Sequence, residues 1–382
     1  MSTQVIASNY AVASDTVTSE ALLARLERLP ITRRLKAIRV IVGLSTFFDA
    51  YTIIAIAFAL PQLTQEWGLT PTFVGLIIAA SYVGQLCGAL FFGSLAEKIG
   101  RIGVLRITIV MFVLMDAACL FAWNGWSILI IRFLQGVGIG AEVPVASAYI
   151  NEFVGAKKRG RFFLLYEVIF PIGMMFAGLV GYFLVPIYGW KVMFLIGLVP
   201  SALTVPLRWL MPESPRWLES RGRYQEAEKV MRSIEEGVIR QTGKPLPPVV
   251  IADDGKAPQA VPYSALLTGV LLKRVILGSC VLIAMNVVQY TLINWLPTIF
   301  MTQGINLKDS IVLNTMSMFG APFGIFITML VMDKIPRKTM GVGLLILIAV
   351  LGYIYSLQTS MLLITLIGFF LITFVYMYVC YA

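Results

Sequence analysis

Ten stretches of mainly apolar residues recur along this chain of 382 residues. Each has about the 20 residues that an α-helix needs to cross the hydrocarbon core of a bilayer. Only 13% of the residues are charged, which excludes an ordinary cytosolic domain. The predicted spans cover residues 40–61, 73–95, 103–123, 126–150, 162–187, 191–210, 275–297, 311–332, 339–357 and 361–381. We therefore expect an all-α protein embedded in a lipid bilayer.

Positive charge is distributed unevenly between the loops that join these spans. All but three of the 30 Lys and Arg residues fall before span 1 or after an even-numbered span. Of the three exceptions, Lys191 and Lys308 follow odd-numbered spans, on the other side of the membrane from the basic loops, and Arg132 lies inside span 4. Because basic loops stay in the cytoplasm, both termini are expected there, in a multi-pass plasma membrane protein such as one of a bacterial inner membrane. A net charge of +10 interleaved with apolar spans does not suit nucleic acid, so no such partner is expected.

Two polar segments divide the chain. The first holds Leu22, Leu23, Leu26 and Leu29 on one helical face, which suits either the membrane surface or a loosely ordered tail. The second includes a predicted surface helix near 222–236 and a proline-rich linker. The expected parts are a cytoplasmic tail 1–38, an N-terminal bundle 39–210, a cytoplasmic linker 211–272 and a C-terminal bundle 273–382.

An internal repeat relates spans 1–3 to spans 7–9. Shifting the sequence by 236 residues superposes Pro61 on Pro297, Gly68 on Gly304, Ser81 on Ser317, Gly84 on Gly320, Gly88 on Gly324, Glu97 on Asp333, Lys98 on Lys334 and Arg101 on Arg337. Duplicated halves around a midplane site are a common plan of transporters. Glycines four residues apart, such as Gly84 and Gly88, allow two membrane helices to pack closely.

Four motifs resemble the major facilitator superfamily. They are Gly93-Ser-Leu-Ala-Glu97-Lys98-Ile-Gly100-Arg101 between spans 2 and 3, Arg132-Phe-Leu-Gln135-Gly136-Val-Gly138-Ile-Gly140 in span 4, Glu152 with Arg159-Gly160, and Pro212-Glu213-Ser-Pro-Arg216-Trp217-Leu218 after span 6. The last two are similar to signatures of sugar-porter-like and metabolite:proton symporter branches. The resemblance implies a twelve-helix major facilitator fold, so the ten spans predict a six-helix N-terminal bundle, an incomplete four-helix C-terminal bundle and a fragment of a longer parent.

The resemblance also implies a cytoplasmic gate of ion pairs. Its predicted members are Glu97, Lys98, Arg101, Glu152, Arg159, Glu213 and Arg216, with Asp333 and Arg337 from the repeat. These charges all fall at cytoplasmic helix ends, where partial burial strengthens an ion pair. Ordinary interfacial anchors are the alternative interpretation.

Charges inside the spans are candidates for function, because a charge at the bilayer centre costs about 2.5–3.5 kcal/mol on insertion scales. Asp49 lies near the middle of span 1 and Glu142 near the middle of span 4. Removal from water favours the neutral acid, so both are predicted to couple transport to a proton. Arg132 is expected either to neutralise one of these acids or to hold an anionic substrate. Asp116 and Glu167 are weaker candidates.

Polar side chains in spans 4 and 7 are candidates for substrate binding. The predicted substrate ligands are Arg132, Gln135, Gln289, Tyr290 and Asn294, and Trp295 is equally well read as an interfacial anchor. They suit a hydroxylated or aromatic ligand.

Several chemistries are excluded by composition. The chain has no His, and its four Cys residues are scattered singly, so no metal site, cofactor or enzymatic centre is expected. The stretch Phe47-Phe48-Asp49-Ala50-Tyr51-Thr52 resembles part of the D-G-x-D element of aromatic-acid:proton symporters, with Thr52 in place of the second acid. We expect a monomeric proton symporter of a small organic acid. The alternatives are a sugar or polyol symporter and a transporter-derived sensor without coupled transport.

Overall fold

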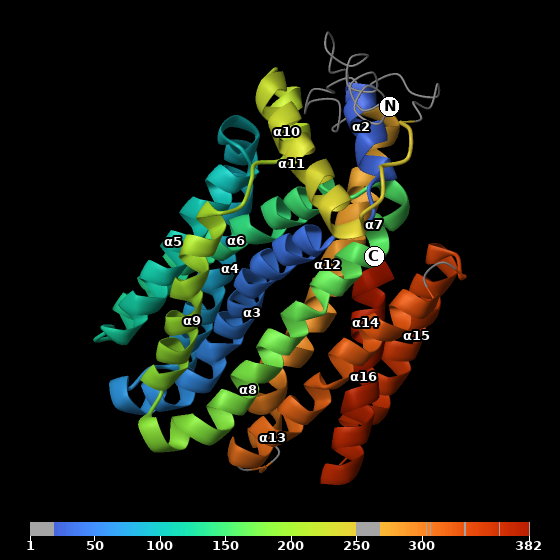
Figure 1. Ribbon diagram of the computed structural model, residues 1–382. Coiled ribbons are helices and arrows are strands. Elements are labelled where there is room, and N and C mark those ends of the chain that lie inside the picture. The colour runs from blue at the N-terminus through green and yellow to red at the C-terminus, as the bar shows by residue number, and fades with distance from the viewer. Residues whose placement is uncertain are drawn as a thin grey trace, which may run out of the picture.

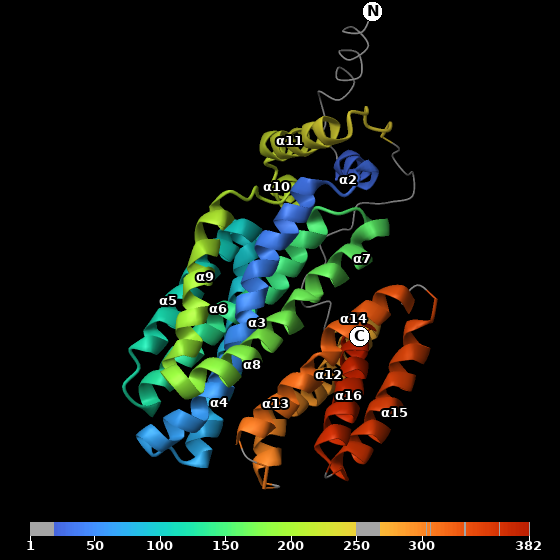
Figure 2. The ribbon, with the colours of Figure 1, turned by 60° about the horizontal axis from the view of Figure 1, so that its bottom comes forward.

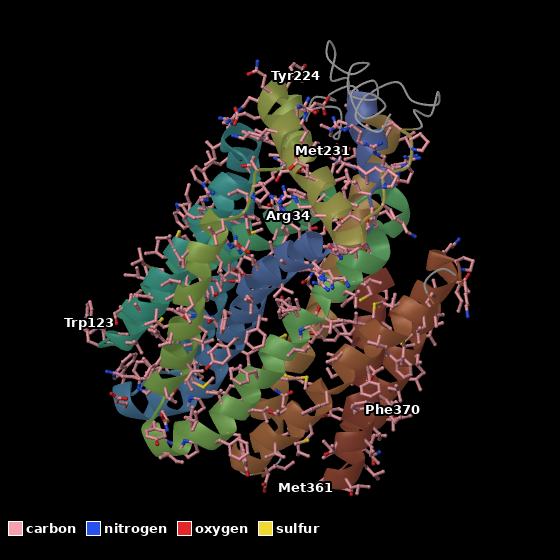
Figure 3. All side chains as sticks on the ribbon, viewed as in Figure 1. Arg34, Trp123, Tyr224, Met231, Met361 and Phe370 are labelled. Atoms are coloured by element: carbon pink, nitrogen blue, oxygen red, sulfur yellow. The ribbon has the colours of Figure 1, made fainter. Side chains whose placement is uncertain are left out.

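The computed structural model describes residues 19–249 and 268–381, apart from positions 303, 306, 332, 333 and 359. Within these residues every regular element is a helix and no strand occurs. Ten helical stretches are long and apolar enough to cross a membrane. Figure 1 shows them as a bundle of steeply inclined helices, and Figure 3 shows apolar side chains such as the half-exposed Phe370 projecting from its flank. The predicted all-α membrane fold is confirmed.

The helices are α2 (Ser19–Arg28), α3 (Arg33–Trp67), α4 (Pro71–Ile99), α5 (Arg101–Leu120), α6 (Gly125–Glu152), α7 (Ala156–Glu167), α8 (Ile169–Tyr188), α9 (Lys191–Trp209), α10 (Pro215–Ser220), α11 (Tyr224–Thr242), α12 (Gly269–Thr302), α13 (Leu307–Met318), α14 (Gly320–Val331), α15 (Arg337–Ser356) and α16 (Met361–Tyr381). We refer to α3–α9 as the N-terminal half and to α12–α16 as the C-terminal half.

Helices α4 and α6 meet at the level of their backbones. Gly84 and Gly88 in α4 lie against the carbonyl oxygens of Phe133 and Val137 in α6, so that any Cβ at either glycine would collide with backbone. Close approach of this kind lets helices associate in lipid, where no hydrophobic force drives them together. The packing role predicted for these two glycines is confirmed.

The same contact recurs in the C-terminal half. Gly320 and Gly324 in α14 lie against the carbonyl oxygens of Phe369 and Thr373 in α16. Each of these four residues stands 236 positions after its counterpart in α4 and α6. The repeat in the sequence is therefore also a repeat of a helix contact.

Two of the predicted spans are interrupted. Span 5 divides into α7 and α8 at Val168, and span 8 divides into α13 and α14 at Phe319. Each break lies three residues before a proline, Pro171 in one case and Pro322 in the other. Proline has no N–H to donate to the carbonyl four residues earlier, and its ring crowds that carbonyl, so the helix is disturbed there. The broken helices α8 and α13 pack on each other and join the two halves.

The short helix α2 packs on another helix of the same chain. Figure 2 shows α2, α10 and α11 together at one end of the bundle, which we call the capped end. Leu22 and Leu26 are no more than 1% exposed and share a core with Met231 and Ile234 of α11. The expectation that this apolar face lies on the membrane surface is therefore wrong, because α11 covers it. The side chain of Leu23 lies outside the described residues.

Candidate functional site

Among the side chains that the structure describes, five charged ones are buried inside the N-terminal half. They come from α3, α5, α6 and α9, none is more than 3% exposed, and they are Asp49, Asp116, Arg132, Glu142 and Arg208. We call this set the buried charge cluster. Buried charges need partners, because each loses its hydration without compensation otherwise.

Glu142 forms an ion pair with Arg208. The Glu142 carboxylate contacts the Arg208 guanidinium and also accepts a hydrogen bond from Thr108 Oγ1 at 3.2 Å. Arg208 donates a second hydrogen bond to the carbonyl oxygen of Leu105 at 3.0 Å. The sequence pointed to Arg132 as the neutralising cation and missed Arg208. The sequence does carry a signal for Arg208, since this residue falls inside the sixth predicted span. Its assignment to the basic loop after that span conceals that it is a charge within the membrane.

Arg132 is linked to Asp116 through an amide. Arg132 Nη1 donates to Gln135 Oε1 at 2.6 Å and to the carbonyl oxygen of Thr52 at 3.2 Å. Gln135 Nε2 in turn donates to Asp116 Oδ1 at 2.7 Å. Gln135 was predicted to bind substrate, but in this structure its amide connects Arg132 to Asp116.

Asp49 differs from the other acids of the buried charge cluster. Its Oδ2 atom is buried and, like Asp116 Oδ2, has no hydrogen-bond partner among the described residues, but Asp49 lacks the hydrogen bond that Gln135 gives to the other oxygen of Asp116. Glu142, Arg208 and Asp116 all lie close enough to influence its charge. The structure thus brings Asp49 and Glu142 into one region, and their part in proton coupling stays a prediction.

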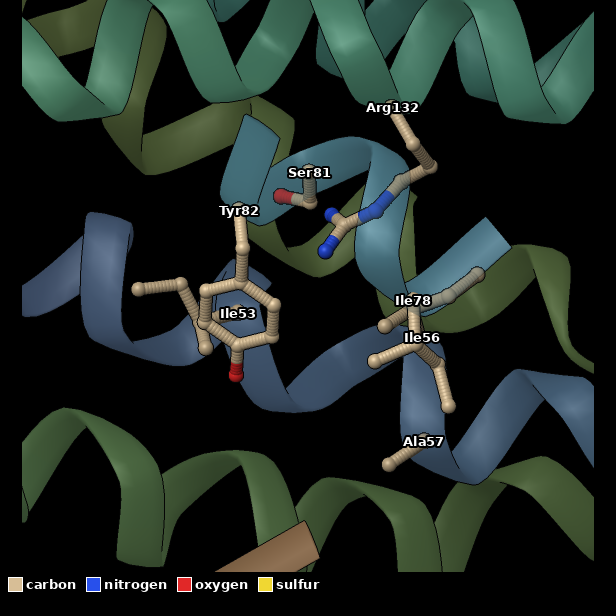
Figure 4. Close-up of a pocket in the computed structure, with 7 residues that line it drawn as sticks. All are labelled: Ile53, Ile56, Ala57, Ile78, Ser81, Tyr82 and Arg132. Atoms are coloured by element: carbon tan, nitrogen blue, oxygen red, sulfur yellow. The ribbon is translucent and has the colours of Figure 1, made fainter. Parts of the chain in front are cut away.

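A small pocket opens beside the cluster. Figure 4 shows the Arg132 guanidinium turned into it, next to Ser81 and Tyr82 of α4. The remaining lining residues are Ile53, Ile56, Ala57 and Ile78. The ring of Tyr82 meets that of Tyr290 in α12 edge to face, with their centroids 5.4 Å apart, so the pocket lies near the contact between the two halves.

The C-terminal half contributes amides and aromatic side chains. Gln289 Nε2 donates to Tyr376 Oη at 3.2 Å, and the Tyr376 hydroxyl reaches Met174 Sδ in α8 at 3.4 Å. Gln289 is therefore turned toward α16, whereas Tyr290 faces α4. The predicted side chains of Asn294 and Trp295 lie outside the described residues.

Four of the predicted gate residues meet at the capped end. Arg101 forms ion pairs with Glu97 at 2.9 Å and Glu152 at 3.1 Å, and its backbone N–H donates to Glu213 at 3.1 Å. Burial raises the pKa of Glu213, against the lowering effect of the backbone N–H groups that bind it. Gly100 has φ +99° and lies directly against the Glu213 carboxylate, where no Cβ fits.

The other predicted gate residues are placed differently. Lys98 is exposed and has no ion pair within the described part of the chain, and Arg216 is half-buried nearby. Asp333 and the side chains of Arg159 and Arg337 lie outside the described residues. A gating role for any of these residues stays a prediction.

The sequence pattern of the Major Facilitator Superfamily matches residues 42–382. The chain belongs to the major facilitator superfamily. It is 64% identical over 318 residues to the putative metabolite transport protein YdjK of Escherichia coli (strain K12), covering 82% of this chain and 68% of that protein. The inner membrane metabolite transport protein YdjE of the same organism is 32% identical over 370 residues, with coverages of 94% and 80%.

Two further comparisons bear on this major facilitator protein. The niacin transporter NiaP of Acinetobacter baylyi is 34% identical over 289 residues, which cover 76% of this chain and 65% of that protein. Among solved structures, the proton:xylose symporter XylE bound to 6-bromo-6-deoxy-D-glucose matches with a TM-score of 0.72 at 20% identity, over 91% of this chain and 81% of that one. This likeness shows the fold. The chain is thus a multi-pass inner membrane transporter of the major facilitator superfamily.

Proposed function

We propose that this transporter carries a small organic acid together with a proton by alternating access. The observation that carries the proposal is the composition of the buried charge cluster, which holds three carboxylates and only two guanidinium groups. With every group ionised, the cluster has one negative charge in excess inside the membrane. A single bound proton removes that excess, which is the property that a proton-coupled site requires.

Asp49 is the proposed carrier of this proton. Glu142 is held by Arg208, and Asp116 is held by the amide of Gln135. Asp49 Oδ2 and Asp116 Oδ2 are both buried without a hydrogen-bond partner in the described residues, but the other oxygen of Asp116 accepts from Gln135, whereas no such bond joins Asp49 to a described residue. A protonated Asp49 has an O–H group that can donate a hydrogen bond, and the Glu142–Arg208 ion pair stays intact.

The substrate class is proposed from two independent observations. Arg132, the other buried cation, faces a pocket beside an aromatic pair that spans the two halves. The relative NiaP is named for niacin, an aromatic carboxylic acid. Both support a small aromatic acid over a sugar, with Tyr290 of α12 facing the substrate from the other half. Asn294 stays a predicted substrate ligand.

The alternating access itself is proposed to be a rocking of residues 39–210 against 273–382, joined by the linker 211–272. In this proposal the chain acts as a monomer with the capped end in the cytoplasm. The ion pairs of Arg101 with Glu97 and Glu152, together with Glu213, then belong to the gate at that end.

The proposal is tested by uptake into proteoliposomes that contain this chain. An inward proton gradient should drive accumulation of labelled nicotinate or benzoate, and labelled xylose should not accumulate. Asp49→Asn should abolish accumulation driven by the gradient but keep exchange of substrate across the membrane at equal pH, since only the proton step is removed.

Glu66→Gln is the matched control. Glu66 lies at the end of α3, 17 residues after Asp49 of the cluster. It accepts a hydrogen bond from Trp190 Nε1 at 3.0 Å, and a glutamine at this position can accept the same bond. This variant should transport like the unmodified chain. Accumulation that does not respond to the proton gradient would show that the chain is not a proton symporter. Gradient-driven accumulation that survives in Asp49→Asn would show that Asp49 does not carry the proton.

A further inference from the structure

Two hydrogen-bond donors in the pocket beside the buried charge cluster lack an acceptor. Arg132 Nε and the Ser81 hydroxyl are both buried and have no hydrogen-bond partner among the described residues. Arg132 is 1% exposed and Ser81 is 2% exposed, and both line the pocket of Figure 4. Buried polar groups are nearly always paired, so two unpaired donors in one cavity point to an acceptor that belongs there.

The residues that line the pocket indicate what kind of acceptor suits it. Its walls are apolar apart from the donors, with three isoleucines and Ala57 on the sides. Tyr82 lies between the pocket and the ring of Tyr290 in the opposite half. A ligand with a carboxylate at one end and a flat apolar body at the other satisfies both parts of this surface.

The repeat shows that the fold itself does not require these unpaired donors. Ser317 and Gly368 occupy the positions 236 residues after Ser81 and Arg132. There the Ser317 hydroxyl donates to the carbonyl oxygen of Leu313 at 2.9 Å, and its side chain lies directly against Gly368. In the C-terminal half the two equivalent positions are therefore in contact, and the serine hydroxyl is hydrogen-bonded. In the N-terminal half a pocket lies at these positions, and the Ser81 hydroxyl has no hydrogen-bond partner among the described residues.

We propose that Arg132 and Ser81 bind the carboxylate of an aromatic monocarboxylate, with the ring directed toward Tyr82 and Tyr290. This inference rests on the proposed function and assigns the anion subsite within it. A carboxylate can accept from a guanidinium and a hydroxyl at once, and such charge-assisted bonds are the strong ones. Because the anion adds negative charge beside Asp116, its binding favours proton uptake by the cluster, which is the sense of coupling in symport.

The test is binding, measured without any proton gradient, so that it is independent of coupled transport. Purified protein in detergent is heated with increasing benzoate or nicotinate, and the dissociation constant follows from the rise in melting temperature. Ser81→Ala should weaken binding about tenfold or more, as expected for loss of a hydrogen bond to a charged group. Arg132→Lys should weaken binding further, because lysine keeps the positive charge but lacks the planar set of N–H groups with which a guanidinium binds both oxygens of a carboxylate.

Ser317→Ala is the matched control, since it removes the equivalent hydroxyl from the C-terminal half. Its affinity for benzoate should equal that of the unmodified chain. Benzamide, which has the same shape without the charge, should not stabilise the protein. Equal binding by Ser81→Ala and the unmodified chain, equal binding of benzamide and benzoate, or no stabilisation by either acid overturns the subsite, whether or not proteoliposomes show proton-driven uptake.

Discussion

The two halves of this transporter share their helix contacts and differ in their buried charges. The glycine contacts between α4 and α6 recur between α14 and α16 at a constant offset of 236 residues. The buried charges do not recur. At the same offset Asp49, Asp116, Arg132 and Glu142 are replaced by Met285, Gly352, Gly368 and Tyr378.

This difference separates what the fold needs from what the chemistry needs. A contact present in both halves is explained by packing, because both bundles must hold their helices together in lipid. A buried charge present in one half is costly and contributes nothing to the common architecture. The N-terminal half is thus the proposed place of proton and carboxylate binding, and the C-terminal half supplies amide and aromatic surfaces such as Gln289 and Tyr290.

The largest expected effect comes from breaking the Glu142–Arg208 ion pair of the N-terminal half. Arg208→Met leaves the Glu142 carboxylate buried without its cation, and removing one partner of a buried pair typically costs about 3–5 kcal/mol. The melting temperature in detergent should fall strongly. The double variant Arg208→Met/Glu142→Met should recover much of this loss, because no unpaired charge then remains.

A double variant that melts no higher than Arg208→Met would contradict this expectation. It would mean that the two side chains stabilise the bundle separately, for example through the bonds of Arg208 to Leu105 and of Glu142 to Thr108. The attraction between Glu142 and Arg208 would then not explain why both are buried. The difference in buried charge between the two halves would no longer imply a difference in function.

The shared glycines should give a smaller and equal effect in the two halves. Gly88→Ala and Gly324→Ala each place a Cβ against a backbone carbonyl that cannot move aside as a side chain can. Overpacking of this kind costs about 1–3 kcal/mol. Both variants should lower the melting temperature by similar amounts, as measured by the same thermal unfolding.

Gly75→Ala serves as the control for these two variants. Gly75 lies in α4 with no atom near the position of an added Cβ, so alanine there should be neutral or slightly stabilising through its better helix propensity. A loss in Gly88→Ala without a loss in Gly324→Ala would show that the repeated contact stabilises only one half.

Much of this comparison could be predicted from the sequence. The spans follow from their length and apolar composition, and the glycine contacts follow from spacing together with the repeat. The breaks at Val168 and Phe319 could also have been found, since Pro171 and Pro322 stand in the predicted spans. Composition alone treats such a proline as a tolerated member of a membrane helix.

The partners of the buried charges could not be predicted, because pairing depends on which helix faces which. Glu142 lies on the same helix as Arg132, yet its cation is Arg208 of α9. The linear sequence gives the helix positions of both arginines but not the rotation of α9 against α5 and α6. For the same reason the sequence left the apolar face of α2 to either the membrane surface or a loosely ordered tail, when its leucines in fact face α11.

The smallest expected effect concerns the contact between α2 and α11, which lies outside the repeated spans. Glu235 of α11 binds Arg25 at 2.7 Å and Arg28 at 2.6 Å. Burial by itself would raise the pKa of Glu235, but the hydrogen bonds and charges of Arg25 and Arg28 outweigh burial and hold the pKa below its usual range. Since the folded pKa is depressed, these ion pairs contribute fully above the ordinary glutamate pKa of about 4.3, and the contribution is lost as the pH falls through the folded value.

Glu235→Gln should therefore loosen α2 at neutral pH by about 1 kcal/mol, as expected for partly exposed ion pairs that form a small network. Amide hydrogen exchange in α2 should be faster in this variant than in the unmodified chain at neutral pH. Acidification below the ordinary glutamate pKa should lower the protection of α2, measured relative to the intrinsic exchange rate at each pH, more in the unmodified chain than in the variant. Glu236→Gln is the control, because the neighbouring pair of Glu236 with Arg240 at 3.3 Å is exposed. Equal protection of α2 in all three proteins would mean that its leucines, and not its arginines, hold it on α11.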